Sequence, residues 1–216
     1  MSADVSARIA ERLGQHGVVV VASELEALSA YYTVLYKWNA RMNLTALRDG
    51  ADALDRLIVE PVLASRLMPE SAQHLDVGSG GGSPALPLRA MRAGFRSCLV
   101  ESRTRKVAFL REAARCMRLG HVRVEACRVE DLQPPPVLFS LVTVRAVRLD
   151  GPLVAAIERL IVPSASLWYF AGPNEAFDAP GGAWTRVLDE ELVGEKQSRV
   201  VCFTWNNAAA VSRGTA

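Results

Sequence analysis

The sequence contains few cysteines and no long hydrophobic run, and both shortages restrict the class of protein. Its 216 residues include four cysteines, none in a C-x-x-C pair or at the spacing of a metal site (Cys98, Cys116, Cys127 and Cys202). We therefore expect free thiols in a reducing compartment and no bound metal. The longest apolar stretch near the start covers residues 18–22, which is far too short for a membrane span or a signal peptide. The sequence thus predicts a cytoplasmic protein with no membrane partner.

A glycine-rich turn follows a short apolar run. Residues 76–82 read Asp-Val-Gly-Ser-Gly-Gly-Gly, with glycines at alternate positions (Gly78, Gly80 and Gly82). Because glycine has no Cβ and tolerates a positive φ, a strand that ends in such a turn brings bare backbone against a ligand. Dinucleotide-binding folds place the third glycine one residue later, where this chain has Ser83. The D-x-G-x-G-x-G spacing instead resembles the first motif of the S-adenosylmethionine (SAM) methyltransferases, against the alternative of a glycine-rich hairpin or linker.

A second carboxylate, Glu101, stands 25 residues after Asp76. It ends a second apolar strand, residues 97–101, and a predicted helix separates the two strands. An acid in this position of a βαβ unit can accept hydrogen bonds from both hydroxyls of a ribose. The turn and the acid together therefore predict a ligand that contains a nucleoside, and SAM carries an adenosine.

Helical periodicity covers the first part of the chain. Three helices are expected there, at residues 4–15, 23–40 and 51–67. Ser23, with Glu26 three residues later, is typical of a capping box at the start of the second helix, and Pro61 interrupts the third. These patterns predict an N-terminal helical extension over residues 1–70.

Strands and helices alternate in the rest of the chain. Five strands are expected, at residues 73–77, 97–101, 122–126, 139–144 and 165–170. The helices between them begin at Pro84, Arg103 and Gly151, and such alternation gives parallel strands with crossover helices. Residues 184–192 and 199–205 predict an antiparallel pair at the sheet edge. The expected fold class is α/β, with a seven-stranded, mostly parallel, Rossmann-like sheet over residues 71–206 and a flexible tail over residues 207–216.

Basic residues concentrate in the middle of the chain. The net charge is +2, but residues 89–148 hold 13 Arg and Lys against 5 Asp and Glu, whereas the remainder holds 12 against 18. A basic middle with acidic flanks indicates an anionic partner, with RNA the natural candidate. Three arginines share one face of the helix that begins at Arg103, opposite an apolar face (Arg111, Arg115 and Arg118 against Val107, Leu110, Ala114 and Met117). This basic stripe either follows a phosphate backbone or solvates the helix.

Several segments, in their order along the chain, resemble one family. Residues 38–45, Trp-Asn-Ala-Arg-Met-Asn-Leu-Thr, look like the W-N-x-x-x-N-L-T segment of the bacterial small-subunit ribosomal RNA methyltransferase G family, also called the GidB family. Residues 76–87 are similar to its D-V-G-[ST]-G-x-G-x-P-x-x-P run, and residues 101–110 to its [DE]-S-x-x-[KR]-[KR]-x-x-F-L. The pairs Val129-Glu130 and Arg145-Ala146 match those after its third and fourth strands. The sequence is identified as a diverged member, over about residues 35–172.

The resemblance implies SAM-dependent methylation of a guanine N7 in 16S ribosomal RNA, with S-adenosyl-L-homocysteine as the second product. The partner would be 16S rRNA or the small ribosomal subunit, and the protein a monomer. The implied cofactor-binding residues are Asp76, Gly78, Ser79, Gly80, Gly82, Glu101, Ser102, Val129, Glu130 and Arg145. Arg145 and Asn43 are the implied catalytic residues, and Arg145, at the carboxyl end of a strand, is expected to contact an RNA phosphate or guanine O6. Asn39 and Asn43 instead cap the end of their helix in the reading that we favour, and Arg145 has the alternative of a salt bridge to Glu101 or Glu130.

The expected chemistry needs little from the side chains. Guanine N7 already presents a lone pair, so that its methylation requires neither a nucleophilic side chain nor a strong base. Catalysis then rests on holding N7 in line with the methyl group in a dry pocket. The sequence has no Pro-Cys pair, which 5-methylcytosine enzymes need, and no Asn/Asp-Pro-Pro-aromatic tetrapeptide, which methylation of exocyclic amines usually requires.

The sequence departs from the family pattern where substrate contacts are expected. Residues 57–61, Leu-Ile-Val-Glu-Pro, replace the usual H-x-x-D-S and lack its His and Ser, and residues 170–172, Phe-Ala-Gly, lack the Lys of Leu-Lys-Gly. A neighbouring arginine can replace a lost cation. Two alternatives to the rRNA enzyme therefore stay open: a SAM-dependent methyltransferase acting on another RNA or a small molecule, and a paralogue that binds SAM without turnover. The glycine spacing disfavours a NAD-dependent dehydrogenase.

Overall fold

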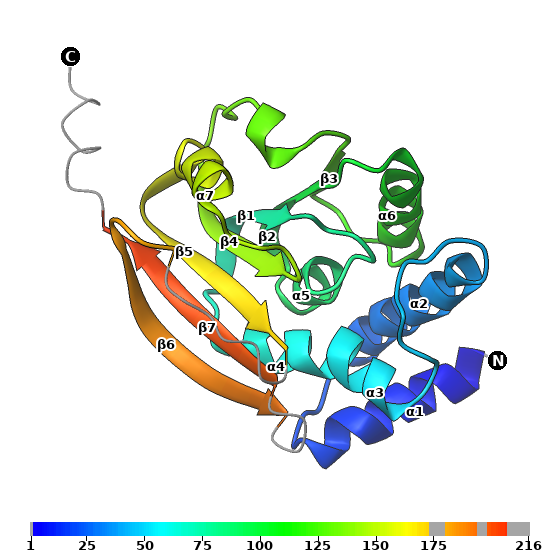
Figure 1. The fold of residues 1–216 in the computed structure, drawn as a ribbon. Helices are drawn as coiled ribbons and strands as arrows, with labels where there is room; N and C mark the ends of the chain where they lie inside the picture. Colours follow the sequence, from blue (N-terminus) through cyan, green and yellow to red (C-terminus); the bar gives the residue numbers. More distant parts are fainter. Residues whose placement is uncertain (1, 173–179, 194–197, 207–216) are drawn as a thin grey trace.

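The computed structural model describes residues 2–172, 180–193 and 198–206, and one seven-stranded sheet runs through them (Figure 1). Five strands are parallel, in the order β3-β2-β1-β4-β5, and β7 pairs antiparallel with both β5 and β6. The strands are β1 Ser71–Val77, β2 Gly94–Val100, β3 Val122–Glu125, β4 Phe139–Arg145, β5 Ile161–Ala171, β6 Trp184–Val193 and β7 Ser198–Trp205. The predicted α/β class and the antiparallel pair at the edge are confirmed.

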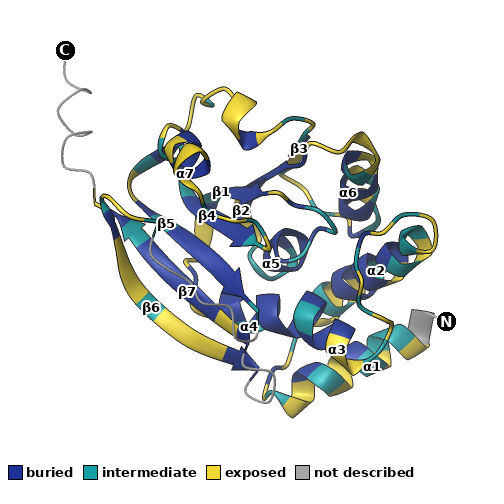
Figure 2. Ribbon diagram, in the orientation of Figure 1, coloured by how far each residue is buried: buried dark blue, intermediate teal, exposed yellow. Residues whose placement is uncertain are grey.

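Helices cover both faces of the sheet. On one face α7, Gly151–Glu158, packs against apolar strand residues such as Val142 and Leu167. The other α-helices gather on the opposite side (Figure 1): α1 Ser2–Gln15, α2 Ala22–Asn39, α3 Ala51–Leu54, α4 Glu60–Ser65, α5 Ala85–Met91 and α6 Thr104–Cys116. Figure 2 shows the central strands buried, whereas the edge strand β6 is exposed along most of its length.

The strand order places a ligand crevice between β1 and β4. Successive strands proceed in one direction from β1 to β3, and the chain then crosses to the other side of β1 to form β4 and β5. In open α/β sheets, ligands bind outside the carboxyl ends of the strands at such a switch point. The ends of β1 and β4 are Val77 and Arg145, so that the glycine turn and Arg145 flank this crevice.

Some element boundaries differ from the prediction. Helix α2 begins at Ala22, and the residue that reaches back to the amide preceding the helix is Glu24, which accepts from Val21 N at 2.9 Å. The predicted capping box of Ser23 and Glu26 is therefore wrong, because the helix begins one residue before Ser23.

The helix predicted over residues 51–67 is broken into three pieces. Helix α3 leads into a π-helical turn, Asp55–Val59, and α4 follows with Pro61 in its first turn. Pro61 has no N–H for the preceding turn, and side chains bind two carbonyls of that turn instead: Arg56 O accepts from Arg145 and Leu57 O accepts from Ser83 Oγ.

Three further expectations concern the cysteines, membrane-spanning helices and the C-terminal tail. The four cysteines are free, as predicted; Cys98 and Cys202 are buried, and Cys116 and Cys127 are partly buried. Across residues 2–172, 180–193 and 198–206, none of the helices has the length and apolar character that crossing a bilayer requires. The predicted tail over residues 207–216 lies outside the described residues.

Candidate active site

The glycine turn after β1 adopts a backbone that only glycine takes without strain. Gly78, Gly80 and Gly82 have φ values of +69°, +50° and +84°. A Cβ on Gly78 would lie 2.7 Å from a side-chain methyl of Val147, and one on Gly82 would lie 2.7 Å from Leu86. A Cβ on Gly80 would meet nothing closer than 3.6 Å. Gly78 and Gly82 are thus required by the protein's own packing, whereas the space beside Gly80 is open.

Glu101 lies directly beside the turn. Glu101 is 7% exposed. Its two carboxylate oxygens accept hydrogen bonds from Gly80 N at 3.0 Å and from Arg103 N at 2.8 Å. A carboxylate oxygen can accept a second hydrogen bond. The carboxylate therefore supports the turn and still has acceptor capacity.

Two cavities meet at the turn, and Gly78 lines both of them. The first, called here the Glu101 cavity, has a volume of about 350 Å³, and its walls include Glu101, Ser102, Val129, Glu130 and Asp150. The second, called here the Arg145 cavity, has a volume of about 330 Å³, and its walls include Ser79, Gly80, Ser83, Lys106, Arg145, Arg56, Leu44 and Thr45. The structure thus brings most of the predicted site residues to these two adjoining cavities.

Asp76 is buried beneath the turn, at the end of β1. One carboxylate oxygen, Oδ1, accepts from Thr143 Oγ1 at 2.5 Å, and the other, Oδ2, has no hydrogen-bond partner among the described residues. Burial raises the pKa of Asp76 to about 6, against the hydrogen bond from Thr143 and the charge of Arg145, which lower it. An unpartnered buried carboxylate oxygen is costly, and its presence indicates a place for a donor that a ligand or a water supplies.

Arg145 is held by protein groups. Its guanidinium contacts Glu60 Oε2 at 2.8 Å, Arg56 O at 2.5 Å and Ser83 Oγ at 3.1 Å, and its side chain is 9% exposed. It also lies over the ring of Phe170, 4.6 Å from the centroid. Burial lowers the pKa of Arg145 to about 10, although the charge of Glu60 raises it.

The alternative predicted for Arg145 was a salt bridge to Glu101 or Glu130. Arg145 does form a salt bridge, but neither of these acids is its partner. The acid is Glu60, which lies inside the segment 57–61 that departs from the family pattern. The error arose because the two residues are separated by 85 positions in the sequence. Arg145 lines its cavity as a rigid wall and has little freedom to extend toward an RNA phosphate.

The two predicted asparagines have different places. Asn39 holds the loop after α2: its Oδ1 accepts from Leu44 N at 2.8 Å and from Thr45 N at 3.0 Å, and its Nδ2 donates to Thr45 O at 3.1 Å. These bonds differ from the predicted helix cap, because they go to the loop and not to carbonyls of α2, whose C-cap is Ala40; they position Leu44 and Thr45 in the Arg145 cavity.

Asn43 is exposed and lies outside the Arg145 cavity. It lines a neighbouring groove of about 470 Å³, called here the basic groove, together with Met42, Arg103, Thr104, Arg105 and Lys106. Lys106 belongs to both the groove and the Arg145 cavity. The basic groove therefore continues from the cavity across the start of α6.

The basic stripe on α6 is only partly available. The apolar face opposite to it is buried as predicted, at Val107, Leu110, Ala114 and Met117. Arg111 donates to Val124 O at 3.1 Å, and Arg115 forms an ion pair with Glu112 at 2.8 Å. Arg118 lies beyond the end of the helix at Cys116, so that the predicted three-arginine helical face is interrupted.

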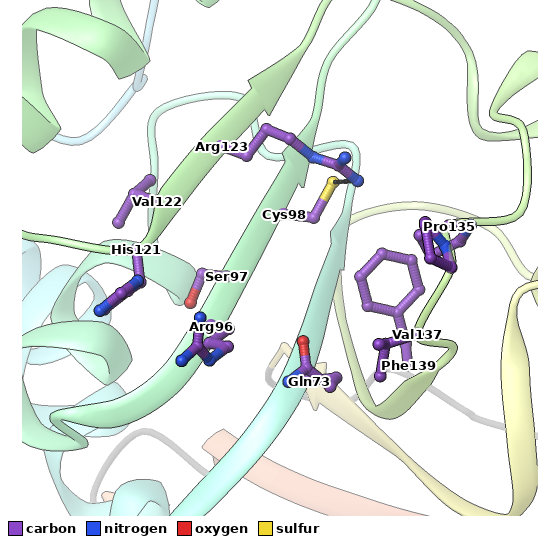
Figure 3. Close-up of a pocket in the computed structure, with 11 residues that line it drawn as sticks. Gln73, Arg96, Ser97, Cys98, His121, Val122, Arg123, Pro135, Val137 and Phe139 are labelled. Carbon is purple, nitrogen blue, oxygen red and sulfur yellow. Dashed lines mark hydrogen bonds between the residues drawn. The ribbon is translucent and has the colours of Figure 1, made fainter.

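A further cavity, of about 390 Å³, lies at the opposite edge of the sheet, where the parallel strands begin (Figure 3). Gln73, Arg96, Cys98 and Phe139 line it, and Arg123 Nη2 donates to Cys98 Sγ at 3.4 Å. It contains none of the predicted site residues. It is therefore separate from the crevice at the carboxyl ends of the strands.

Three residues of the site were not predicted from the sequence. Glu60 could have been found as an acid within an otherwise apolar helical run, since such an acid needs a buried partner. Lys106 lies inside the [KR]-[KR] motif, but nothing in the motif says that its side chain reaches the cavity. Thr143 is a residue type that is common in β-strands, so the sequence does not single it out. Only the pairing of β1 with β4 reveals its contact with Asp76.

The solved structures that resemble this fold include methyltransferases. A SAM-dependent methyltransferase from Aquifex aeolicus superposes with a TM-score of 0.55, at 16% identity, over 73% of this chain and 94% of that one. At this identity the likeness shows the fold alone. With a glycine turn at the switch point, the fold belongs to the Rossmann-like class.

The family within that class follows from the sequence comparisons. The profile of the GidB family, described as rRNA small subunit methyltransferase G, matches residues 24–175. A protein from Xanthomonas euvesicatoria named Ribosomal RNA small subunit methyltransferase G is 34% identical over 86% of both chains. One of the same name from Burkholderia pseudomallei is 35% identical over 77% of this chain and 76% of its own. This chain belongs to the rRNA small subunit methyltransferase G family.

Proposed function

We propose that this protein transfers a methyl group from SAM to N7 of a guanine in 16S ribosomal RNA. The observation that carries the proposal is the glycine turn at the switch point, with the Glu101 cavity on one side and the Arg145 cavity on the other. Membership of the family supports ribosomal RNA as the substrate class. A ribosomal substrate implies a cytoplasmic protein, and we expect it to act as a monomer.

The residues around the turn fit SAM. Glu101 has acceptor capacity for ribose hydroxyls, and the unpartnered Oδ2 of Asp76, which lines neither cavity, is suited to the ammonium group of the methionine portion through a water. Val129 and Glu130 line the same cavity as Glu101 and would border the adenine. The open space beside Gly80 allows a ligand to approach the backbone.

The Arg145 cavity suits a flat base. Bound SAM supplies an electrophilic methyl group to an incoming lone pair, and N7 of guanine needs no deprotonation to provide that lone pair. The chain's own residues therefore have two tasks, to orient the guanine and to exclude water. Leu35, Leu44 and Leu57 supply apolar walls, and Arg145, held by Glu60, supplies a rigid one.

The basic groove would receive the RNA backbone beside the flipped base. Arg103 and Arg105 are exposed cations at the start of α6, and Lys106 joins the groove to the Arg145 cavity. Cationic side chains that follow a phosphate backbone supply most of the affinity for nucleic acid. We therefore assign Asn43 to RNA contact in this groove and Arg145 to the wall of the base cavity.

The missing family lysine has a local substitute. The guanidinium of Arg56 donates to Ala171 O at 3.1 Å, at the end of β5, where the family pattern has Leu-Lys-Gly. Arg56 also lines the Arg145 cavity. A cation thus stands near the position that the lost lysine would occupy, which supports retention of an anionic substrate.

The test is transfer of radiolabelled methyl from SAM to small ribosomal subunits from cells that lack the endogenous enzyme. Strand cleavage at 7-methylguanosine would then map the product, and large subunits serve as the control substrate. We expect label at a single 16S guanine. Label on another RNA would move the proposal to a different substrate, and SAM binding without any transfer would indicate a non-catalytic binder.

A further inference from the structure

Four buried polar side chains form a continuous chain across three strands of the sheet. His74 and Asp76 lie on β1, Ser97 on β2 and Thr143 on β4, and each residue is at most 3% exposed. His74 Nδ1 lies 3.0 Å from Ser97 Oγ, and His74 Nε2 lies 2.8 Å from Thr143 Oγ1. Thr143 Oγ1 in turn lies 2.5 Å from Asp76 Oδ1. The strand register explains the contacts, since His74 pairs with Ser97 and Asp76 pairs with Thr143.

The protons in this chain can be assigned from the donor and acceptor capacity of each group. An ionised Asp76 only accepts, so the single hydroxyl proton of Thr143 points to it. Thr143 Oγ1 must then accept from His74, which places the ring proton on Nε2. Burial lowers the pKa of His74 to about 3, so that the ring is neutral and Nδ1 is an acceptor. Ser97 therefore donates to Nδ1.

We propose that this Ser97–His74–Thr143 chain, with all of its donors directed at Asp76, keeps the Asp76 carboxylate ionised and ready for the ammonium group of SAM. The inference rests on the proposed function, because it takes Asp76 as a cofactor-binding residue. His74 touches neither cavity wall and acts through Thr143. It is a positioning residue.

The chain counters the main penalty on a buried carboxylate, which is the loss of water. Hydrogen bonds that point the same way polarise one another, and the last of them strengthens as its acceptor carries charge. Without an ionised acceptor the direction of the chain could reverse, with a protonated Asp76 donating to Thr143. The protonation state of Asp76 and the tautomer of His74 are thus coupled.

Other charged groups also face Asp76. Arg145 at the end of β4 lowers its pKa, and Glu101 beyond β2 raises it. The Tyr31 hydroxyl from α2, which donates to Gly81 O at 2.7 Å, also interacts electrostatically with Asp76, and Lys106 from α6 approaches Gly80. None of these groups is altered by a substitution at Thr143, so the contribution of the chain can be measured separately.

A purely structural role would give a different result from the proposed one. Loss of the Thr143 hydroxyl leaves His74 Nε2 and Asp76 Oδ1 without their partner, which costs stability under either role. If the chain only fills the core, such a change leaves the pH dependence of SAM binding unmoved. If the chain keeps Asp76 ionised, the pKa of Asp76 rises when Thr143 is lost, and binding then disappears at a higher pH.

The experiment is calorimetric titration of SAM between pH 5.5 and pH 8.5 with the wild type, Thr143→Val and Thr143→Ser. Binding that needs ionised Asp76 is complete above its pKa and is lost as the pH falls through it. We expect Thr143→Val to move the midpoint up by about one pH unit, and to weaken affinity about fivefold at pH 6 but little at pH 8.5. Thr143→Ser keeps the hydroxyl and should follow the wild type.

Equal midpoints for Thr143→Val and the wild type overturn the inference, as does uniform weakening at every pH. Failure of the wild type to bind SAM would instead refute the proposed function. A second measurement uses the wild type alone: where Asp76 is ionised, from pH 7 to pH 8.5, ¹⁵N imidazole spectra should show one of the three histidines neutral, with the proton on Nε2. An Nδ1–H tautomer or a titrating ring at His74 overturns the inference independently.

Discussion

The carboxylate of Glu60 contacts two guanidinium groups through one oxygen. Its Oε2 lies 2.8 Å from Arg145 Nη2 and 2.8 Å from Arg56 Nη1, and Glu60 is 2% exposed. Arg145 and Arg56 both line the cavity that we assign to the guanine. One buried acid thus sets the position of two cations at the substrate side of the glycine turn.

Removing that charge should destabilise the fold. We expect Glu60→Gln to lower the free energy of unfolding by about 3 kcal/mol, because Arg145 remains buried without a counter-charge. Urea unfolding measures the effect. Glu112→Gln is the matched control, since Glu112 also pairs with an arginine but lies at the surface, where loss of the pair should change little. Equal losses in the two variants would show that Glu60 does not neutralise Arg145.

A side chain at Gly80 should abolish SAM binding. The backbone there has a φ of +50° and open space beside it, so that Gly80→Val strains the turn and fills the space that the cofactor needs. Gly181→Val is the control, because Gly181 also has a positive φ, +84°, with nothing near its Cβ. Calorimetry should find SAM affinity lost in the first variant and retained in the second. Unchanged affinity in Gly80→Val would refute the cofactor position.

The architecture could be predicted because its signals are local. The glycine turn, the apolar strands and the helices between them each lie within a short stretch, and their order alone implies the parallel sheet and its switch point. The segment 97–101, ending in Glu101, needed no tertiary information. The helix caps were less predictable. Glu24 and Glu26 both lie near the start of α2, and the residue at which the helix begins determines which of them accepts from the preceding amide.

The inner contacts of the site could not be predicted because they join distant positions. Glu60 meets Arg145 only when the π-helical turn over residues 55–59 and strand β4 are both in place. His74 reads as an ordinary polar residue in a strand, and its partners lie 23 and 69 residues away. Such contacts depend on strand register, which a single sequence specifies only through its apolar pattern.

Glu101 should recognise the hydroxyl groups of the SAM ribose. Glu101→Gln is expected to weaken SAM binding about tenfold, because a hydrogen bond to a charged acceptor is lost. The same variant should bind the 2′,3′-dideoxy analogue of S-adenosylhomocysteine as well as the wild type does. Glu101 also accepts from Gly80 N, so a purely structural defect in the turn would weaken both ligands equally, and that result contradicts a ribose contact.

The basic groove and the basic stripe can be distinguished by the salt dependence of RNA binding. Arg105→Ala should reduce the slope of log affinity against log salt by about one, as expected for one lost phosphate contact. Arg118→Ala, beyond the end of α6, should leave the slope unchanged, and neither variant should alter SAM affinity. Equal reductions would mean that RNA also follows the stripe, and a reduction in Arg118→Ala alone would exclude the groove.

The burial of His74 should make the fold sensitive to acid. Burial lowers the pKa of His74 to about 3, whereas the unfolded chain has a histidine pKa of about 6.5. Between these values the unfolded state binds the extra proton, so stability that is present above pH 6.5 is lost as the pH falls. From pH 7 to pH 4.5 the wild type should lose about 2–3 kcal/mol more than His74→Phe, measured by urea unfolding at each pH. A higher pKa of Asp76 in the variant would act in the same direction, because protonation of the folded state then stabilises it. Parallel pH profiles for the two proteins would mean that the buried ring becomes protonated in the folded state.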